Sequence, residues 1–233
     1  MSIRRIAPIA ALSVVIAVTA CSDPKSTSPA DRSNANATVR LANATDARLD
    51  FRQGNAVVDG GGNLAFSAMS SCTSVSAAEP QLTVTSAGKS GNLAGFDPSF
   101  DAGNSYTVVA FPGGGSATSF AMLLNAFRPA GGSAGFRILN ATSDPAAIDA
   151  YVTNPGTALT ALTTRTTANT SAGTASAFVN VTAGTRQIRI TTTGTHTVVL
   201  DAGSSNRLNA GTNYTIVVAP GQAGLRSFLV AAC

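Results

Sequence analysis

The chain nearly repeats itself, and this repeat is the feature that most limits the folds open to it. Three separate blocks occur twice, in the same order, and the spacing between the copies grows along the chain. The pairs are VRLANAT at 39–45 with FRILNAT at 136–142, QLTVT at 81–85 with QIRIT at 187–191, and AGNSYTVV at 102–109 with AGTNYTIV at 210–217. Three collinear blocks predict two copies of one folding unit.

Each block has the pattern of a β-strand. Apolar and polar residues alternate, as where Val39 and Leu41 flank Arg40, which is typical of a half-buried strand. Clusters of turn residues such as DGGGN at 59–63 separate the blocks. Every stretch longer than ten residues with helical spacing of apolar residues is interrupted by Gly, Pro or a Thr run. The sequence therefore predicts an all-β fold of two tandem antiparallel β-sandwich domains, immunoglobulin-like in class.

The copies occupy residues 38–128 and 136–233, and each is large enough for its own core. Between them the segment PAGGSAG at 129–135 contains a Pro and three glycines, which predicts a linker. The Thr-rich run at 157–175 lengthens the second copy. It reads as an exposed loop or an edge strand, and we favour the solvated loop.

The N-terminus has the order of a secretory signal peptide: Arg4 and Arg5, then an apolar stretch over 6–20, then Cys21. The stretch is shorter than the roughly 20 apolar residues that span a bilayer, so a transmembrane protein is not expected. The residues VTAC at 18–21 resemble the bacterial lipobox. This resemblance implies a signal peptide of residues 1–20, cleavage before Cys21 and attachment of diacylglycerol to its thiol, followed by acylation of the new amino terminus.

Two or more acyl chains are what stable membrane anchoring requires. The alternative is an ordinary signal peptide with a chance cysteine nearby. The residue after the cysteine is Ser22 and not an Asp. By the usual lipoprotein sorting rule, this implies export to the outer membrane. Residues 22–37 are polar and rich in Ser, Asn and Pro, so 21–37 is predicted to be the lipidated cysteine with a flexible tether.

Charge and aromatic content argue against a nucleic-acid partner. Removal of the signal peptide leaves 13 basic against 11 acidic residues, a formal charge of +2 where the full chain has +4. Arginines are scattered singly, lysines occur only at 25 and 89, and Trp is absent, whereas nucleic-acid binders cluster basic residues among aromatics.

With Cys21 assigned to lipid, Cys72 and Cys233 form an even pair in an oxidising compartment. We predict a disulfide between them that joins the second copy to the first. The alternative is two free thiols.

No catalytic residue, metal site or cofactor is predicted. His196 is the only histidine, so no zinc-ligand set exists, and no GxSxG stretch supports a serine hydrolase. We expect His196 to be an exposed strand residue, with a Ser-His-Asp triad as the alternative. The remaining motifs read as structural. We expect Asn43 and Asn140 to form Asx turns, and Tyr106 and Tyr214 to be core rings with hydrogen-bonded hydroxyls. The glycines at 60–62 and 113–115 are expected to lie in turns.

The motifs together resemble the bacterial domain of unknown function 4397 family over about 38–230. They are the lipobox, the R-[LI]-x-N-A-[ST] opening, the pairs Leu49-Asp50 and Ile148-Asp149, and the AG-x-x-Y-T-[VI]-V close. The second copy, with Asp149-Ala150-Tyr151-Val152, fits the family pattern better than the first. The resemblance implies an exported β-sandwich module, often in tandem, and brings no activity or catalytic residue with it.

These observations predict a lipid-anchored protein of the bacterial cell envelope, facing the periplasm or the surface. We expect a non-catalytic binding or structural module, whose partners are the membrane through its anchor and an envelope protein or polysaccharide. One alternative is carbohydrate binding, disfavoured by the absence of Trp and the presence of only three Tyr. The other is an envelope hydrolase with a cryptic site around His196.

Overall fold

The computed structural model describes residues 35–233, and every regular element in this part of the chain is a β-strand. The N-terminal half holds β1 (Asn36–Asn43), β2 (Leu49–Gln53), β3 (Ala56–Val57), β4 (Thr73–Ser76), β5 (Leu82–Ser86), β6 (Ser105–Pro112) and β7 (Thr118–Leu124). The C-terminal half holds β8 (Ser133–Asn140), β9 (Ala147–Thr153), β10 (Thr167–Ser171), β11 (Val179–Thr182), β12 (Gly184–Thr192), β13 (Val198–Asp201), β14 (Asn206–Leu208), β15 (Asn213–Gly221) and β16 (Gly224–Ala231). The prediction of an all-β chain is confirmed.

The predicted signal peptide, Cys21 and most of the tether lie outside the described residues. The boundary predicted for the end of the tether, residue 37, is wrong. The strand β1 already begins at Asn36, and its residue Ala37 is buried in the core. No helix long and apolar enough to cross a membrane occurs within residues 35–233.

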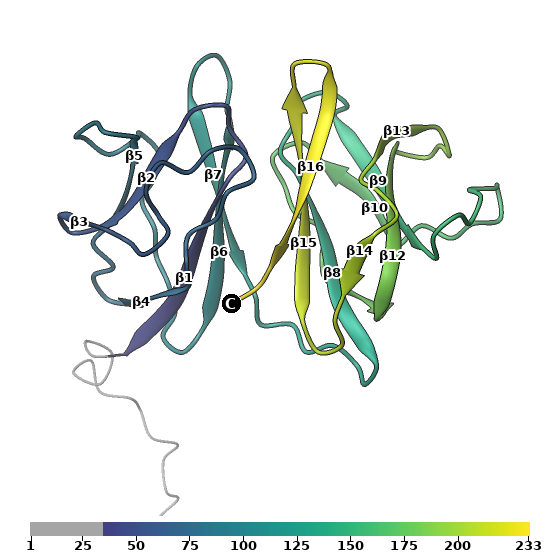
Figure 1. Cartoon of the computed structure of the whole chain (residues 1–233), viewed down its shortest axis with the longest axis horizontal. Coiled ribbons are helices and arrows are strands. Elements are labelled where there is room, and N and C mark those ends of the chain that lie inside the picture. Colours follow the sequence, from purple (N-terminus) through teal and green to yellow (C-terminus); the bar gives the residue numbers. More distant parts are fainter. Residues whose placement is uncertain (1–34) are drawn as a thin grey trace, which may run out of the picture.

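The two halves have matching sheets. Each contains a four-stranded sheet, in the order β4-β1-β6-β7 or β11-β8-β15-β16. Each also has a second sheet, β3-β2-β5 in the N-terminal half and β10-β9-β12-β13 in the C-terminal half, where β14 also pairs with β12. The halves lie side by side, with β6 and β7 facing β15 and β16 in the middle (Figure 1).

The two central strands of each four-stranded sheet are parallel, which corrects the expectation of purely antiparallel sheets. Val39 of β1 lies opposite Tyr106 of β6, and Phe136 of β8 opposite Tyr214 of β15. Parallel neighbours cannot be joined by a tight hairpin and need a crossover connection. Here the crossover runs through the second sheet of the half, and on the way it also supplies an edge strand, β4 or β11, to the four-stranded sheet.

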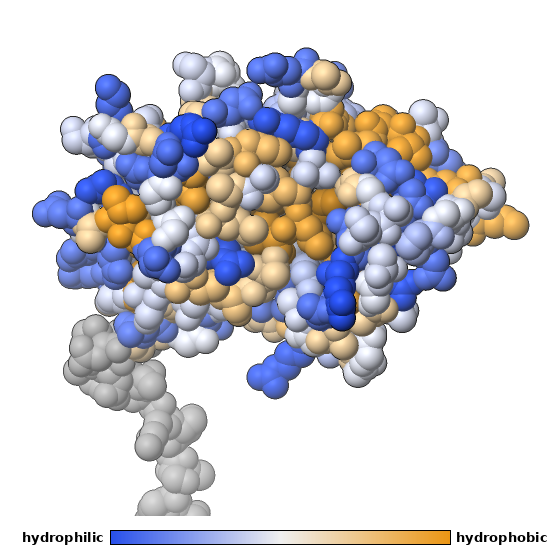
Figure 2. Space-filling view, viewed as in Figure 1, coloured by the Kyte–Doolittle hydropathy of each residue, from blue (hydrophilic) through white to orange (hydrophobic). Residues whose placement is uncertain are grey.

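Three apolar clusters make the core. One lies between the two sheets of each half, and the third lies between the halves. The third cluster is built from equivalent positions of the repeat, and its pairs are Ala42 with Leu139, Ala44 with Ala141, Val109 with Val217, Phe111 with Ala219, and Leu123 with Val230. The inner strands β6, β8 and β15 of the four-stranded sheets are therefore buried on both faces over most of their length. In Figure 2 apolar surface extends over the middle of the molecule, and a further apolar patch lies at the upper right.

Two arginines bond across this interface in a reciprocal way. Arg40 Nη1 of β1 donates to the carbonyl oxygen of Ala231 at 2.8 Å, and Arg137 Nη1 of β8 donates to that of Leu124 at 2.9 Å. Both arginines occupy the same position of the repeat. Their acceptors are also equivalent, because Leu124 and Ala231 lie opposite the matching tyrosines of β6 and β15. The halves thus meet as the subunits of a two-fold symmetric dimer do.

The connection between the halves is 125–132, because β8 already begins at Ser133 within the segment expected to be the linker. The side chain of Arg137 holds the first residue of this connection in place. The Arg137 side chain donates to Thr215 Oγ1 at 2.8 Å and to Asn125 Oδ1 at 2.9 Å, and its guanidinium lies 4.1 Å from the centre of the Phe178 ring. Burial lowers the pKa of Arg137 to about 10, so the group remains charged at neutral pH.

Two further contacts hold the middle of the connection. Asn213 Nδ2 donates to the carbonyl oxygens of Asn125 and Phe127, at 3.2 and 2.8 Å. The Phe127 ring stacks on that of Phe178, with ring centres 5.3 Å apart. The first residues of the connection, Asn125 to Phe127, are therefore packed against the C-terminal half.

A disulfide joins Cys72, just before β4, to Cys233 at the end of the described chain. It links the two halves covalently at a second place, 161 residues apart in sequence. The Thr-rich run at 157–175 combines both structures weighed for it. A loop with Leu162 almost fully exposed is followed by the edge strand β10, so the solvated loop accounts for only part of it.

Candidate functional site

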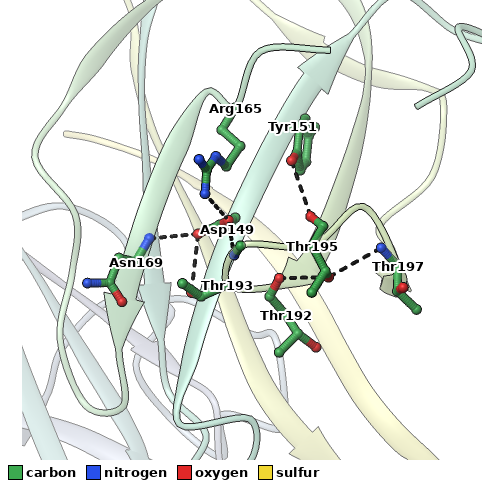
Figure 3. Close-up of polar contacts among 9 residues, drawn as sticks. Asp149, Tyr151, Arg165, Asn169, Thr192, Thr193, Thr195 and Thr197 are labelled. Atoms are coloured by element: carbon green, nitrogen blue, oxygen red, sulfur yellow. Dashed lines mark hydrogen bonds and ion pairs between the residues drawn. The ribbon is translucent and has the colours of Figure 1, made fainter. Parts of the chain in front are cut away.

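Asp149 on β9 is the most enclosed carboxylate of the described chain and the first candidate for chemistry (Figure 3). Its Oδ1 accepts hydrogen bonds from the Asn169 N–H at 2.7 Å and from Thr193 Oγ1 at 3.2 Å. Its Oδ2 accepts from the Gly194 N–H at 2.9 Å and from Arg165 Nη1 at 3.0 Å. Four donors, from the bulge of β10, the turn after β12 and the Arg165 side chain, therefore surround a fully buried group.

The surroundings keep this carboxylate ionised. Burial alone raises the pKa of Asp149, but the N–H groups of Asn169 and Gly194, with the Arg165 and Thr193 side chains, outweigh burial and hold the pKa below its ordinary value. A general acid needs a raised pKa, and a general base needs a free lone pair facing substrate. Asp149 has neither, so its geometry is that of a structural anion.

The N-terminal half has the two backbone hydrogen bonds of this network around Asp50. The N–H of Asn63 donates to Asp50 Oδ1 at 2.7 Å, and the N–H of Gly88 donates to Oδ2 at 3.0 Å. These two bonds hold the pKa of Asp50 below its ordinary value. Asn63 and its equivalent Asn169 both have left-handed backbones, with φ of 51° and 52°. Each carboxylate thus fixes one left-handed asparagine, in a bend for Asp50 and in the bulge of β10 for Asp149, and one glycine turn.

The structural interpretation of the repeated Asn and Tyr residues is confirmed. Asn43 Oδ1 accepts from the N–H of Thr45 at 2.8 Å, and Asn140 Oδ1 accepts from that of Thr142 at 3.3 Å, which closes an Asx turn in each half. Both tyrosine rings of the repeat are buried. Their hydroxyls accept backbone hydrogen bonds, Tyr106 from Asp101 at 3.0 Å and Tyr214 from Asn209 at 3.1 Å.

His196 is exposed as expected, but it lies in the turn between β12 and β13 and not on a strand. The turn at Thr193 and Gly194, which Asp149 fixes, sets its position. Its ring is tilted against that of Tyr151, with centres 5.6 Å apart. Within residues 35–233 no hydrogen bond joins His196 to a serine or a carboxylate, so the described part of the chain does not assemble a triad around it.

The other predicted site residues are cysteines. Cys21, the predicted lipidation site, lies outside the described residues, and Cys72 and Cys233 are joined as described above. Across the described part of the chain, no group of three His, Cys, Asp or Glu side chains is placed to hold a metal ion.

A cavity of about 280 Å³ opens between the halves, beside the turn that joins β6 to β7. On the other side of the two-fold axis the equivalent space is filled. There the Arg226 guanidinium lies 3.5 Å from the centre of the Phe66 ring and forms an ion pair with Asp46 at 2.6 Å. The residues at the same positions of the repeat line the cavity and are small: Ser119, Ala172 and Ser143. The two-fold relation is therefore broken in the side chains while the backbone keeps it.

One comparison with known families gives a match. A family model described as "Domain of unknown function (DUF4397)" matches residues 37–151, just under half of the chain. The match includes all strands of the N-terminal half, then β8 and most of β9, and it stops well before 230, where the resemblance was expected to end. No curated protein matches the chain.

Proposed function

We propose that this protein is a lipid-anchored, non-catalytic binding module of the bacterial cell envelope, built from two tandem immunoglobulin-like β-sandwich domains. The observation that carries the proposal is the use of the buried carboxylates. Asp50 and Asp149 are the acidic groups best shielded from water. The oxygens of both accept hydrogen bonds from backbone N–H groups and so hold the neighbouring backbone in place. Fixed turns on a rigid framework suit recognition, because they lose little entropy on binding.

The anchor rests on the VTAC motif at 18–21 and on the polar segment that follows it. We propose that Cys21 carries the lipid, and that Ser22 directs the protein to the outer membrane. The test is growth with an alkyne-tagged fatty acid followed by membrane fractionation. Wild-type protein should carry the label and sediment with outer membranes. Cys21→Ser should lose both, and Ser22→Asp should keep the label but move to the inner membrane.

An unlabelled wild-type chain that is found free in the periplasm would contradict the anchor while leaving the binding module untouched. For the binding role, the test is co-sedimentation of the purified protein with sacculi and with outer-membrane polysaccharide, at low and high salt. Retention that resists salt supports a glycan-binding module. Without retention on either material, the binding role requires a protein partner, sought by crosslinking in intact cells.

An envelope hydrolase remains the rival with a different chemistry. Its one nitrogen base is His196, which packs against Tyr151. If the protein releases product from an envelope ester or glycan, His196→Ala should abolish that activity in the triad mechanism. Activity that survives the change would eliminate the triad.

A further inference from the structure

A second cavity lies over the outer face of β2 and β5 in the N-terminal half. Its volume is about 590 Å³, which falls in the range of small-ligand sites. Residues of the two strands form its floor, and the turns after β2 and β5 form its walls. Its lining includes the side chains of Arg52, Thr83, Thr85, Lys89 and Ser90. The corresponding edge of the molecule is largely hydrophilic in Figure 2.

Two cations border this cleft without an ion-pair partner. Arg52 is half-buried and donates from Nη2 to the carbonyl oxygen of Asn55 at 2.6 Å, while Lys89 is exposed. In the described part of the chain neither cation lies within ion-pair distance of a carboxylate. The acidic residue that lies beside Thr85 in the register is Asp50, whose two oxygens already accept the N–H groups of its turns.

The equivalent place in the C-terminal half is closed. Tyr151 stands at the position of Arg52, and Thr195 at that of Lys89. The Tyr151 ring is 1% exposed, and its hydroxyl donates to the carbonyl oxygen of Thr195 at 3.3 Å, which closes the turn onto the sheet (Figure 3). In the N-terminal half Arg52 donates instead to the carbonyl oxygen of Asn55, at the turn after its own strand, and does not close the turn at Lys89 onto the sheet. The half with tyrosine and threonine at these two positions is therefore closed, and the half with arginine and lysine has the open cleft.

We propose that this cleft binds an acidic sugar, with Arg52 and Lys89 taking its carboxylate or phosphate group. Arginine matches the two oxygens of such a group, and the bonds are charge-assisted. The hydroxyls of Thr83, Thr85 and Ser90 are placed to bond the sugar hydroxyls. That of Thr85 is buried and has no hydrogen-bond partner within the described residues. The inference rests on the proposed binding role and gives it a ligand class.

The test is calorimetric titration of the full-length protein, purified in detergent from membranes. The probes are trigalacturonate for the carboxylate, glucose 6-phosphate for the phosphate, and maltotriose as the neutral sugar. We expect saturable binding of at least one acidic probe and none of maltotriose. Arg52→Gln and Lys89→Gln should each weaken binding about tenfold or more. Arg128→Gln, which removes an exposed arginine in the connection between the halves, is the matched control and should bind as wild type does.

A second variant converts the open cleft to the closed form of the other half. Arg52→Tyr with Lys89→Thr should abolish binding while the thermal midpoint stays at or above that of the wild type. Failure of both acidic probes to bind, equal binding of maltotriose, or equal weakening by Arg128→Gln would overturn the acidic-sugar site. Labelling of Cys21 is measured separately, so failure here and failure of the anchor are distinguishable.

Discussion

At Asp149 a charged side chain is buried without a large penalty, because four donors replace the water it loses. In Asp149→Asn the shape is retained, but an amide NH₂ then faces N–H donors. We expect the free energy of unfolding at pH 7 to fall by about 2–3 kcal/mol, measured by urea denaturation. Asp97→Asn, at an exposed position, is the control and should change it little. Equal stability of the two variants would contradict the role given to Asp149.

The same carboxylates predict how stability depends on pH. The pKa values of Asp50 and Asp149 are held below the ordinary value in the folded protein, so the unfolded chain takes up these protons first. The stabilisation is fully present above the unfolded pKa of about 4 and is lost as the pH falls through the folded pKa. The stability difference between wild type and Asp149→Asn should therefore narrow below about pH 4 in urea titrations. A difference that stays constant down to pH 2 would refute this.

The connection between β7 and β8 packs against Gly135 of β8, a glycine whose replacement can be tested. A Cβ on Gly135 would lie 2.8 Å from the Phe127 ring and collide with Asn213 Oδ1, the two side chains that hold the connection. Gly135→Ala should lower stability by about 1–3 kcal/mol and speed chymotrypsin cleavage after Phe127. Gly131→Ala, in the same connection with open space around it, should do neither. Similar cleavage rates for both variants would show that the contacts do not restrain the connection.

The strands themselves could be predicted from the sequence, because alternation and turn residues are local signals. The FRILNAT repeat correctly placed β8, and the repeated tyrosines correctly placed the cores. The parallel pairing of β1 with β6 was missed, since parallel and antiparallel neighbours show the same alternation. The interface between the halves was missed too, although the sequence held a signal: residues 216–219, IVVA, are apolar without alternation, as in a strand covered on both faces.

The candidate site was less predictable. The Leu49-Asp50 and Ile148-Asp149 pairs were visible as repeated motifs, but their partners lie up to 45 residues away, on turns that only the fold brings together. The cleft over β2 and β5 was also hidden. Its signal is a difference between the copies, an arginine where the other copy has a tyrosine, and its meaning depends on knowing which side chains face outward.

For the whole molecule, the central cluster predicts that the two halves unfold together. Calorimetry of the wild type should show one transition. Leu139→Asp places a charge in the buried interface, and we expect it to split the transition into two, one for each half. Met122→Asp, at a half-exposed position on β7, should keep a single transition. A single transition for Leu139→Asp, at whatever temperature, would mean that the halves are not coupled through this cluster.

The disulfide should add stability without being needed for the association of the halves. The double variant Cys72→Ser with Cys233→Ser should unfold at lower urea, with a loss of about 2–4 kcal/mol, because the unfolded chain regains the freedom of a long loop. The packed interface remains, so the radius of gyration measured by X-ray scattering should not change. Expansion of the folded double variant would show that the disulfide, and not the interface, holds the halves together.

The reciprocal interface also bears on how this protein could diverge during evolution. In a homodimer one gene encodes both subunits, so every mutation appears on both sides of the symmetry axis. Here the two sides are different segments of one chain, so a mutation on one side leaves the other side unchanged. On one side of the axis Arg226 of the C-terminal half packs on Phe66 of the N-terminal half, where the other side has a cavity; likewise one copy has Tyr151 where the other has an open cleft. Fusion allows one copy to preserve the scaffold while its twin is free to acquire a new binding surface.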